Sequence, residues 1–116
     1  MNYFKKNINN VRGDTYSLGL KVEEIDQALE SAYFTCRDKL NDESNILFQK
    51  SLENGISITS HQGKTYEYAI RIAPEDTQSL QAGIYYYDLE VGINDDIFTI
   101  MKGKFIIEQD TTWEVG

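Results

Sequence analysis

The sequence predicts an all-β domain, and this prediction rests on three observations. Apolar and polar residues alternate along short segments, so that Tyr16, Leu18, Leu20 and Val22 share one face of a strand. Turn signals recur about every 8 to 12 residues. Eight tyrosines and five phenylalanines add to the strand-forming residues. Together these patterns predict a β-sandwich or barrel of seven or eight strands in a single domain, residues 1–116.

The alternating segments mark the candidate strands in order along the chain. They cover residues 15–22, 31–38, 45–52, 55–60, 65–73, 84–93, 97–101 and 104–110. Residues 1–11 precede the first of them and are expected to form either a flexible arm or an additional edge strand.

Polar and glycine-containing breaks separate these strands. Asn54-Gly55 is a strong hairpin signal, residues 61–64 form the next break, and residues 94–96 predict a tight turn. Lys102-Gly103 predicts a bulge or a short turn between the last two candidate strands.

Two segments do not alternate. Ile25 and Leu29 are spaced for a short helix, but strong strand signals flank them closely, so a loop with at most one helical turn is predicted. The segment from Pro74 to Gly83 predicts one helical turn that crosses between sheet edges. Pro74 suits a first helical position, Glu75 and Asp76 complement the helix dipole, and Gly83 is expected to end the helix.

The composition narrows the classes of partner. The formal net charge is −8, which disfavours nucleic acid and anionic membrane surfaces as partners. With one cysteine, Cys36, no intramolecular disulfide can form. The first residues lack the apolar core of a signal peptide, and no apolar run reaches the roughly 20 residues of a membrane span. Synthesis in the cytoplasm is expected.

Chemical motifs are sparse, and no catalytic, cofactor-binding or metal-binding residue is predicted. His61 is the one histidine and lies in a predicted turn, whereas Cys36 lies on a predicted core face, so a nucleophilic pair is not indicated. The acidic groups at residues 23–26, 75–76 and 94–96 lack the spacing of a calcium loop. Arg12-Gly13-Asp14 matches an integrin-binding tripeptide but is interpreted as a turn.

Three consecutive tyrosines follow Gly83. Strand alternation places Tyr85 and Tyr87 toward the core, and it places Tyr86 outward beside Asp88 as a candidate surface contact. The preceding turn also resembles the tyrosine corner of immunoglobulin-type domains, with Tyr85 as the corner residue.

A family resemblance extends from about Arg12 to Thr112. It is carried by Pro74-Glu75-Asp76-Thr77, Leu80, Gly83, Tyr86-Tyr87-Asp88, Thr99-Ile100, Lys102-Gly103 and Asp110-Thr111-Thr112. In this order the motifs resemble the N-terminal domain of the baseplate upper protein of tailed phages and prophages of Gram-positive bacteria.

The resemblance implies an immunoglobulin-like β-sandwich and a structural, non-enzymatic role in a phage tail or baseplate. The implied partners are other tail or baseplate proteins, with a homo-oligomer as a further expectation, and the implied location is the virion. Pro74, Glu75, Asp76, Thr77, Gly83, Tyr85 and Tyr87 are expected to form the turn and core of this domain. The chain ends at Gly116, just past the resembling region, so either a stand-alone structural protein or a truncated longer one is expected.

A carbohydrate-binding β-sandwich is the alternative function. Such modules stack sugars on exposed aromatic rings, and the candidates are Tyr3, Tyr33, Tyr86 and Trp113.

Overall fold

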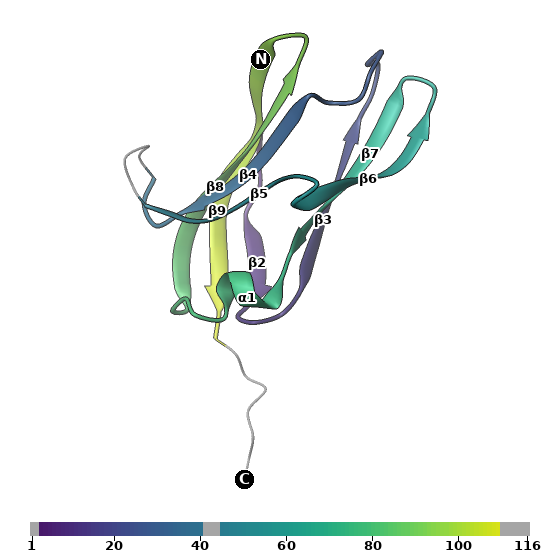
Figure 1. Cartoon of the computed structure of the whole chain (residues 1–116). Coiled ribbons are helices and arrows are strands. Elements are labelled where there is room, and N and C mark those ends of the chain that lie inside the picture. Colours follow the sequence, from purple (N-terminus) through teal and green to yellow (C-terminus); the bar gives the residue numbers. More distant parts are fainter. Residues whose placement is uncertain (1–2, 41–44, 110–116) are drawn as a thin grey trace.

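The computed structural model describes residues 3–40 and 45–109, and the chain is nearly all β over these residues. Its strands are β1 (Phe4–Lys5), β2 (Ile8–Val11), β3 (Tyr16–Val22), β4 (Ser31–Arg37), β5 (Ile46–Leu52), β6 (Gly55–Gln62), β7 (Thr65–Ile72), β8 (Gly83–Ile93) and β9 (Asp96–Glu108). One helical turn, α1 (Pro74–Thr77), connects β7 to β8 and lies at the lower end of the molecule in Figure 1. The all-β prediction is confirmed.

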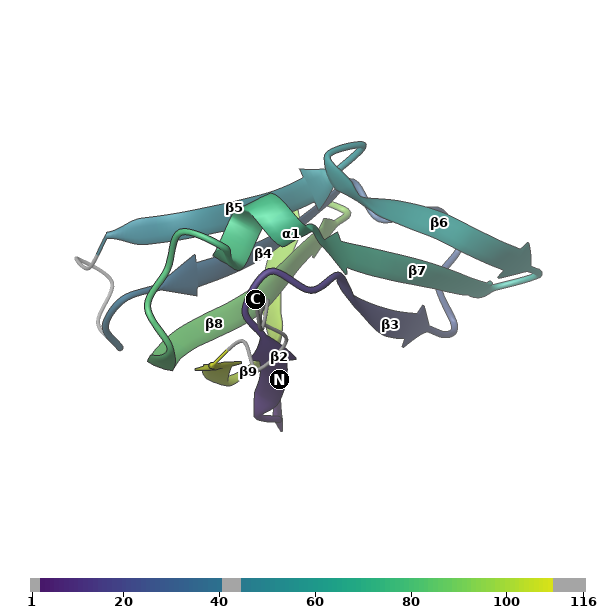
Figure 2. The ribbon, with the colours of Figure 1, turned by 90° about the horizontal axis from the view of Figure 1, so that it is seen from below.

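The strands form one curled, open sheet in the order β1-β9-β8-β4-β5-β6-β7-β3, and β2 also pairs with β9. Figure 2 shows the curl from below, with β4, β8 and β9 on one side and β6, β7 and β3 on the other. The curl turns one face of the sheet inward, and the buried apolar side chains gather there. Because the path does not close, β3 remains at one end of the sheet.

The predicted strands correspond closely to the observed ones, with one difference, and the structure decides between the two alternatives for the N-terminal segment. Candidate segments 97–101 and 104–110 are parts of one strand, β9, as far as Glu108; Asp110 lies outside the described residues. In the N-terminal segment, β1 and β2 pair in parallel with β9, for example Ile8 with Phe105. These residues therefore form edge strands.

Aromatic rings fill the centre of the core. The Phe34 ring stacks between Tyr87 and Phe48, with centroid distances of 5.0 and 6.2 Å. Phe105 meets Phe34 and Phe48 edge-on at 6.2 and 5.7 Å. Such pairs contribute roughly 0.5–1.5 kcal/mol each beyond their buried area. The cluster joins β4, β5, β8 and β9.

The Asn54-Gly55 hairpin prediction is wrong. The chain turns there, but β6 continues beside β5 in parallel for two residue pairs and then pairs with β7. An Asn-Gly hairpin turn needs positive φ at both residues, whereas here Glu53 (φ 66°) and Gly55 (φ 104°) take it. A Cβ at position 55 would also lie 2.7 Å from Cδ of Lys50. The segment is therefore a corner that carries the chain from one side of the curl to the other.

The predicted break at Lys102-Gly103 is also wrong, because β9 runs through it without interruption. The register shift of the β8–β9 pair falls instead between Leu89 and Glu90. Gly103 has a different role: a Cβ there would lie in contact with the carbonyl oxygen of Lys6. Glycine lets the N-terminal segment lie against the face of β9.

The other turn predictions are confirmed. Asn94 and Asp95, with φ of 54° and 66°, form the two-residue turn between β8 and β9. Gly63, with φ of 60°, lies in the β6–β7 hairpin. Residues 23–30 form a loop without a helical turn, held where the Leu29 N–H donates to the buried Tyr68 hydroxyl at 2.9 Å.

Candidate functional site

The helical turn α1 is built by its own first residues. Pro74 occupies the first turn, and the Asp76 carboxylate accepts a hydrogen bond from the N–H of Ala73 at 2.7 Å. The helix ends at Thr77, where the Gln78 N–H donates to the Pro74 carbonyl at 3.0 Å. Gly83 does not end the helix, contrary to the prediction; it is the first residue of β8.

Two long-range contacts fix this turn to the sheet. Asp76 pairs with Lys50 of β5 at 2.6 Å, and both side chains are only 13% exposed. Thr77 is fully buried and accepts a hydrogen bond from the N–H of Gly13 at 2.9 Å. The second residue of the turn, Glu75, is exposed to solvent. Asp76 and Thr77 therefore anchor the chain.

Lys50 was not among the residues that sequence reasoning selected. It alternates with Phe48 and Leu52 along β5 and pairs with the buried Phe34 of β4. A lysine on a core-facing position requires a nearby carboxylate, because an isolated buried charge is costly. This was the signal that could have identified the ion pair.

Tyr87 is a core residue. It is 3% exposed, and its hydroxyl donates to the carbonyl of Lys6 at 2.7 Å. Burial, with a smaller contribution from Tyr16, raises the pKa of the Tyr87 hydroxyl to about 12. The side chain thus ties the N-terminal segment to β8.

Tyr85 and Tyr86 are both half-buried. The Tyr85 hydroxyl donates to the Gln81 carbonyl at 2.7 Å, a bond back to upstream backbone of the kind that the corner comparison leads one to expect. Burial and then the charge of Asp38 raise the pKa of Tyr85. Tyr86 lies opposite Arg37 and Lys104 in the neighbouring strands.

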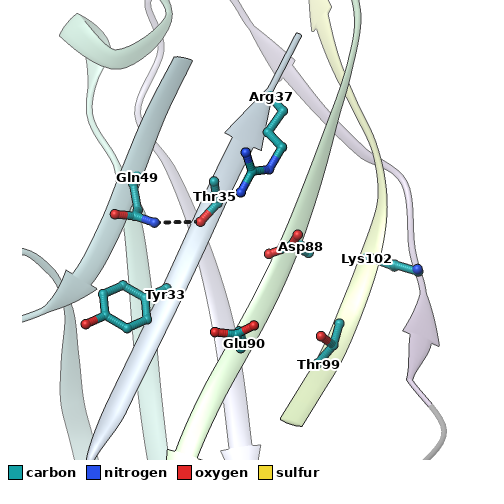
Figure 3. Close-up of a pocket in the computed structure, with 8 residues that line it drawn as sticks. All are labelled: Tyr33, Thr35, Arg37, Gln49, Asp88, Glu90, Thr99 and Lys102. Carbon is teal, nitrogen blue, oxygen red and sulfur yellow. Dashed lines mark hydrogen bonds between the residues drawn. The ribbon is translucent and has the colours of Figure 1, made fainter. Parts of the chain in front are cut away.

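The outer face of the sheet is hollowed over β4, β5, β8 and β9 (Figure 3). The hollow measures about 690 Å³ and is lined by Tyr33, Thr35, Arg37, Gln49, Asp88, Glu90, Thr99 and Lys102. Its lining is mostly polar, and Gln49 donates to the Thr35 hydroxyl at 2.9 Å. Tyr33, which is 40% exposed, is the one aromatic residue in this lining.

The four candidate sugar-stacking aromatics do not form one surface. Tyr33 lines the hollow, and Tyr3 meets it only through Lys102, whose Nζ lies 4.5 Å from the centroid of the Tyr3 ring. Tyr86 does not line the hollow. Trp113 lies outside the described residues.

The titratable residues show no catalytic arrangement over residues 3–40 and 45–109. The ring of His61 is exposed and stacks on Tyr66 at 3.9 Å, while Cys36 is buried. Burial raises the pKa of the Cys36 thiol to about 12, which suppresses the reactive thiolate. No group of three histidine, cysteine or acidic residues is arranged to hold a metal ion in this part of the chain.

Arg12-Gly13-Asp14 forms the turn between β2 and β3. Gly13 has φ of 83°, and the Asp14 N–H donates to the carbonyl of Val11 at 3.0 Å. Elsewhere, no helix within the described ranges has the length and apolar character to span a membrane.

No family model matches the chain, and no curated protein matches it. Among solved structures, it is similar to part of a family 123 glycoside hydrolase from Clostridium perfringens that acts on glycolipid glycans. That match has a TM-score of 0.56 and 15% identity, and covers 94% of this chain but only 24% of the hydrolase. A VGSC β subunit with multimeric cell-adhesive interactions matches with a TM-score of 0.46 and 15% identity, over 93% of each chain. At this identity, the similarity to the hydrolase concerns the fold alone.

Proposed function

We propose that this chain is a structural component of a phage or prophage tail or baseplate and acts by docking to other proteins. The observation that supports this role most directly is the open end of the sheet at β3. Its seven residues pair with β7 on one side and with no strand of the described chain on the other. An unpaired strand edge presents backbone donors and acceptors to which a partner can add a strand.

The positions of the resembling residues support the same proposal. Asp76 and Thr77 bind distant parts of the chain, and Tyr87 lies in the core. Residues with such contacts maintain the fold. The proposed partners, other tail or baseplate proteins, and the proposed location, the virion, are those that the sequence resemblance implies; neither nucleic acid nor a membrane is a proposed partner.

The finer fold that belongs to this proposal is an opened immunoglobulin-like sandwich. The two sides of the curl are joined through β5 and β6, which share only the pairs Ser51–Gly55 and Leu52–Ile56. In some sandwiches, strands pass from one sheet to the other at corners of this kind. The Tyr85–Gln81 hydrogen bond supports the same relationship.

Purified particles test the structural role. Mass spectrometry of virions, induced from a host that carries this gene, should detect the chain at a fixed ratio to the tail proteins. Pairwise binding to the products of neighbouring genes should identify a tail or baseplate partner. Absence of the chain from intact particles, together with neighbours that encode no tail, head or baseplate protein, would overturn the proposal.

Carbohydrate binding is the second candidate function, and the hollow on the outer face favours it. There, the exposed Tyr33 ring stands beside carboxylate, amide and hydroxyl groups that can bond to sugar hydroxyls. Titration with soluble cell-wall oligosaccharides should then show saturable binding that Tyr33→Ala abolishes. Tyr86→Ala is the matched control because Tyr86 lies outside the hollow. Binding that is absent, or equally affected by both variants, would contradict this function.

A further inference from the structure

The strand β3 forms one end of this sheet and, within the described chain, has one unpaired edge along its seven residues. The opposite end of the path is the two-residue strand β1, whereas β3 offers seven residues. Short edge strands and charged edge residues normally protect a sheet from pairing with other chains. Within β3, the single charged residue is Lys21, so its edge is weakly protected.

Gly19, at the centre of β3, is not required by the backbone conformation or by any close neighbour in the described part of the chain. Its φ is not positive, and a Cβ placed there would meet nothing within 4 Å. Glycine in a strand interior is unfavourable for β structure, and it often marks a close approach by another backbone.

The residues of β3 are self-complementary about Gly19. Antiparallel pairing with a second β3 must keep the faces matched, so the pairing can be centred only on a residue. Centring it on Gly19 uses all seven residues and places Leu18 opposite Leu20 and Tyr16 opposite Val22. Lys21 then lies opposite the uncharged Ser17.

Other registers are poorer. Centring on Leu18 or Leu20 leaves five of the seven residues paired, and centring on Lys21 brings two lysines together.

An apolar hollow of about 390 Å³ adjoins the same edge. It is lined by Phe4, Gly19, Leu20, Lys21, Val22, Glu23, Ile100 and Met101. Leu20 and Val22 are only half-buried, and Phe4 is 75% exposed. A strand added at β3 would cover this apolar surface as well as the unpaired backbone.

We propose that the occupant of this edge is a second copy of the chain, paired antiparallel through β3 about a two-fold axis at Gly19. The proposal rests on the docking role given above and names a partner for it. The interface is isologous, because each chain contributes the same strand to one ladder.

Charge substitution at Gly19 tests this arrangement. The open space at this position accommodates a side chain in one chain, whereas two copies of the same charge would face each other at the axis. The wild-type chain should show twice its 13.4 kDa mass by light scattering or sedimentation. Gly19→Glu and Gly19→Lys should each weaken the dimer at least about tenfold, and an equimolar mixture should restore it as a heterodimer.

Gly83→Glu and Gly83→Lys are the matched controls, since Gly83 is also an exposed strand residue with open space around it. They should leave the dimer unchanged, and circular dichroism should show that all variants fold. A wild-type chain that is monomeric at millimolar concentration would overturn the β3 dimer. Gly19 variants as dimeric as the wild type would also overturn it.

These results are separable from those of the docking role itself. A monomeric chain found in virions would refute the dimer and leave the structural role standing. A chain that dimerises through β3 but never occurs in particles would support the dimer and refute the structural role.

Discussion

At the scale of single residues, the three adjacent tyrosines differ in what their rings and hydroxyls contact. Tyr87 packs against Phe34 and bonds to Lys6, so it joins the core to the N-terminal segment. Tyr85 closes a local turn through Gln81, and Tyr86 is half-buried on the outer face. Strand alternation separates Tyr86 from the other two tyrosines. Tyr85 and Tyr87 share a face and differ because their hydroxyls bond to different segments of the chain.

Substitution of these tyrosines should separate the roles. Tyr87→Ala should lower the free energy of unfolding by about 3–4 kcal/mol because it removes a buried ring from a packed cluster. Tyr87→Phe should cost about 1 kcal/mol, since only the hydrogen bond to Lys6 is lost. Tyr86→Ala should cost less than Tyr87→Ala. Urea unfolding measures the stability of all three variants. Equal losses for Tyr86→Ala and Tyr87→Ala would contradict the assignment of Tyr87 to the core face and Tyr86 to the outer face.

The buried Cys36 and Tyr87 predict a loss of stability at high pH. Burial raises the thiol pKa from 9.0 to about 12 and the Tyr87 pKa from 10.0 to about 12. The folded state therefore holds both protons more tightly than the unfolded state, and unfolding releases them once the pH exceeds the unfolded values. The contribution is complete below pH 9 and is lost progressively between pH 9 and about 12.

Urea unfolding at intervals from pH 7.5 to 11 measures this loss. Cys36→Ala should remove the part of the decline that begins near pH 9, and Tyr87→Phe the part that begins near pH 10. A free energy of unfolding that is constant across this range, or a decline that neither substitution reduces, would contradict the prediction.

At the scale of elements, α1 depends on one ion pair more than on its own helix propensity. A four-residue helix is too short to be stable alone. The Lys50–Asp76 pair and the Thr77–Gly13 hydrogen bond supply the tertiary contacts that hold it in place.

Removing one side chain of the Lys50–Asp76 ion pair should therefore lower the free energy of unfolding more than removing both. Asp76→Asn leaves Lys50 without its carboxylate in a site that is 13% exposed, so it should cost about 3 kcal/mol. Lys50→Met with Asp76→Asn should recover part of that loss, because no unpaired charge remains. A double-mutant cycle from urea unfolding gives the coupling energy. Additive losses would mean that the two side chains do not interact.

The same elements show which parts of the fold the sequence predicts. Strand periodicity and the Asn94-Asp95 turn depend on residues only a few positions apart, so the local sequence is enough to predict them. The contact from Tyr87 to Lys6 joins residues 81 positions apart, and no local pattern contains it. The local sequence around Gly103 indicates a break, because the backbone of Lys6 that requires a glycine there is also far away in the sequence.

The candidate surfaces also combine features that depend on local sequence with features that depend on nonlocal strand pairing. Alternation placed Tyr33 on the outer face, yet the hollow beneath it depends on strands β5, β8 and β9 meeting β4 in one order. The local Asn54-Gly55 signal predicts a hairpin, but this prediction is wrong because β6 pairs mainly with β7. Sheet order, which requires nonlocal pairing, is the information that one sequence lacks.

At the scale of the whole molecule, the two sides of the curled sheet differ in aromatic packing and are linked by few backbone pairs. The aromatic cluster joins β4, β5, β8 and β9. Within the described chain, β6, β7 and β3 share the apolar core with them but are linked to them by backbone pairing at just two residue pairs, at the β5–β6 corner. Units with few connections open at lower free energy than the core to which they attach. The β6-β7-β3 side should therefore open before the β4-β8-β9 side.

Amide hydrogen exchange under native conditions measures this difference directly. Backbone amides of β7 that pair with β6 and β3 should exchange at a lower opening free energy than those of β8 that pair with β4 and β9. Gly55→Ala should widen the difference, because its φ of 104° and the nearby Lys50 side chain disfavour a Cβ at the corner. Gly83→Ala, in open space, is the control. Equal opening free energies on both sides, unchanged by Gly55→Ala, would mean that the curl is one cooperative unit and that the corner does not divide it.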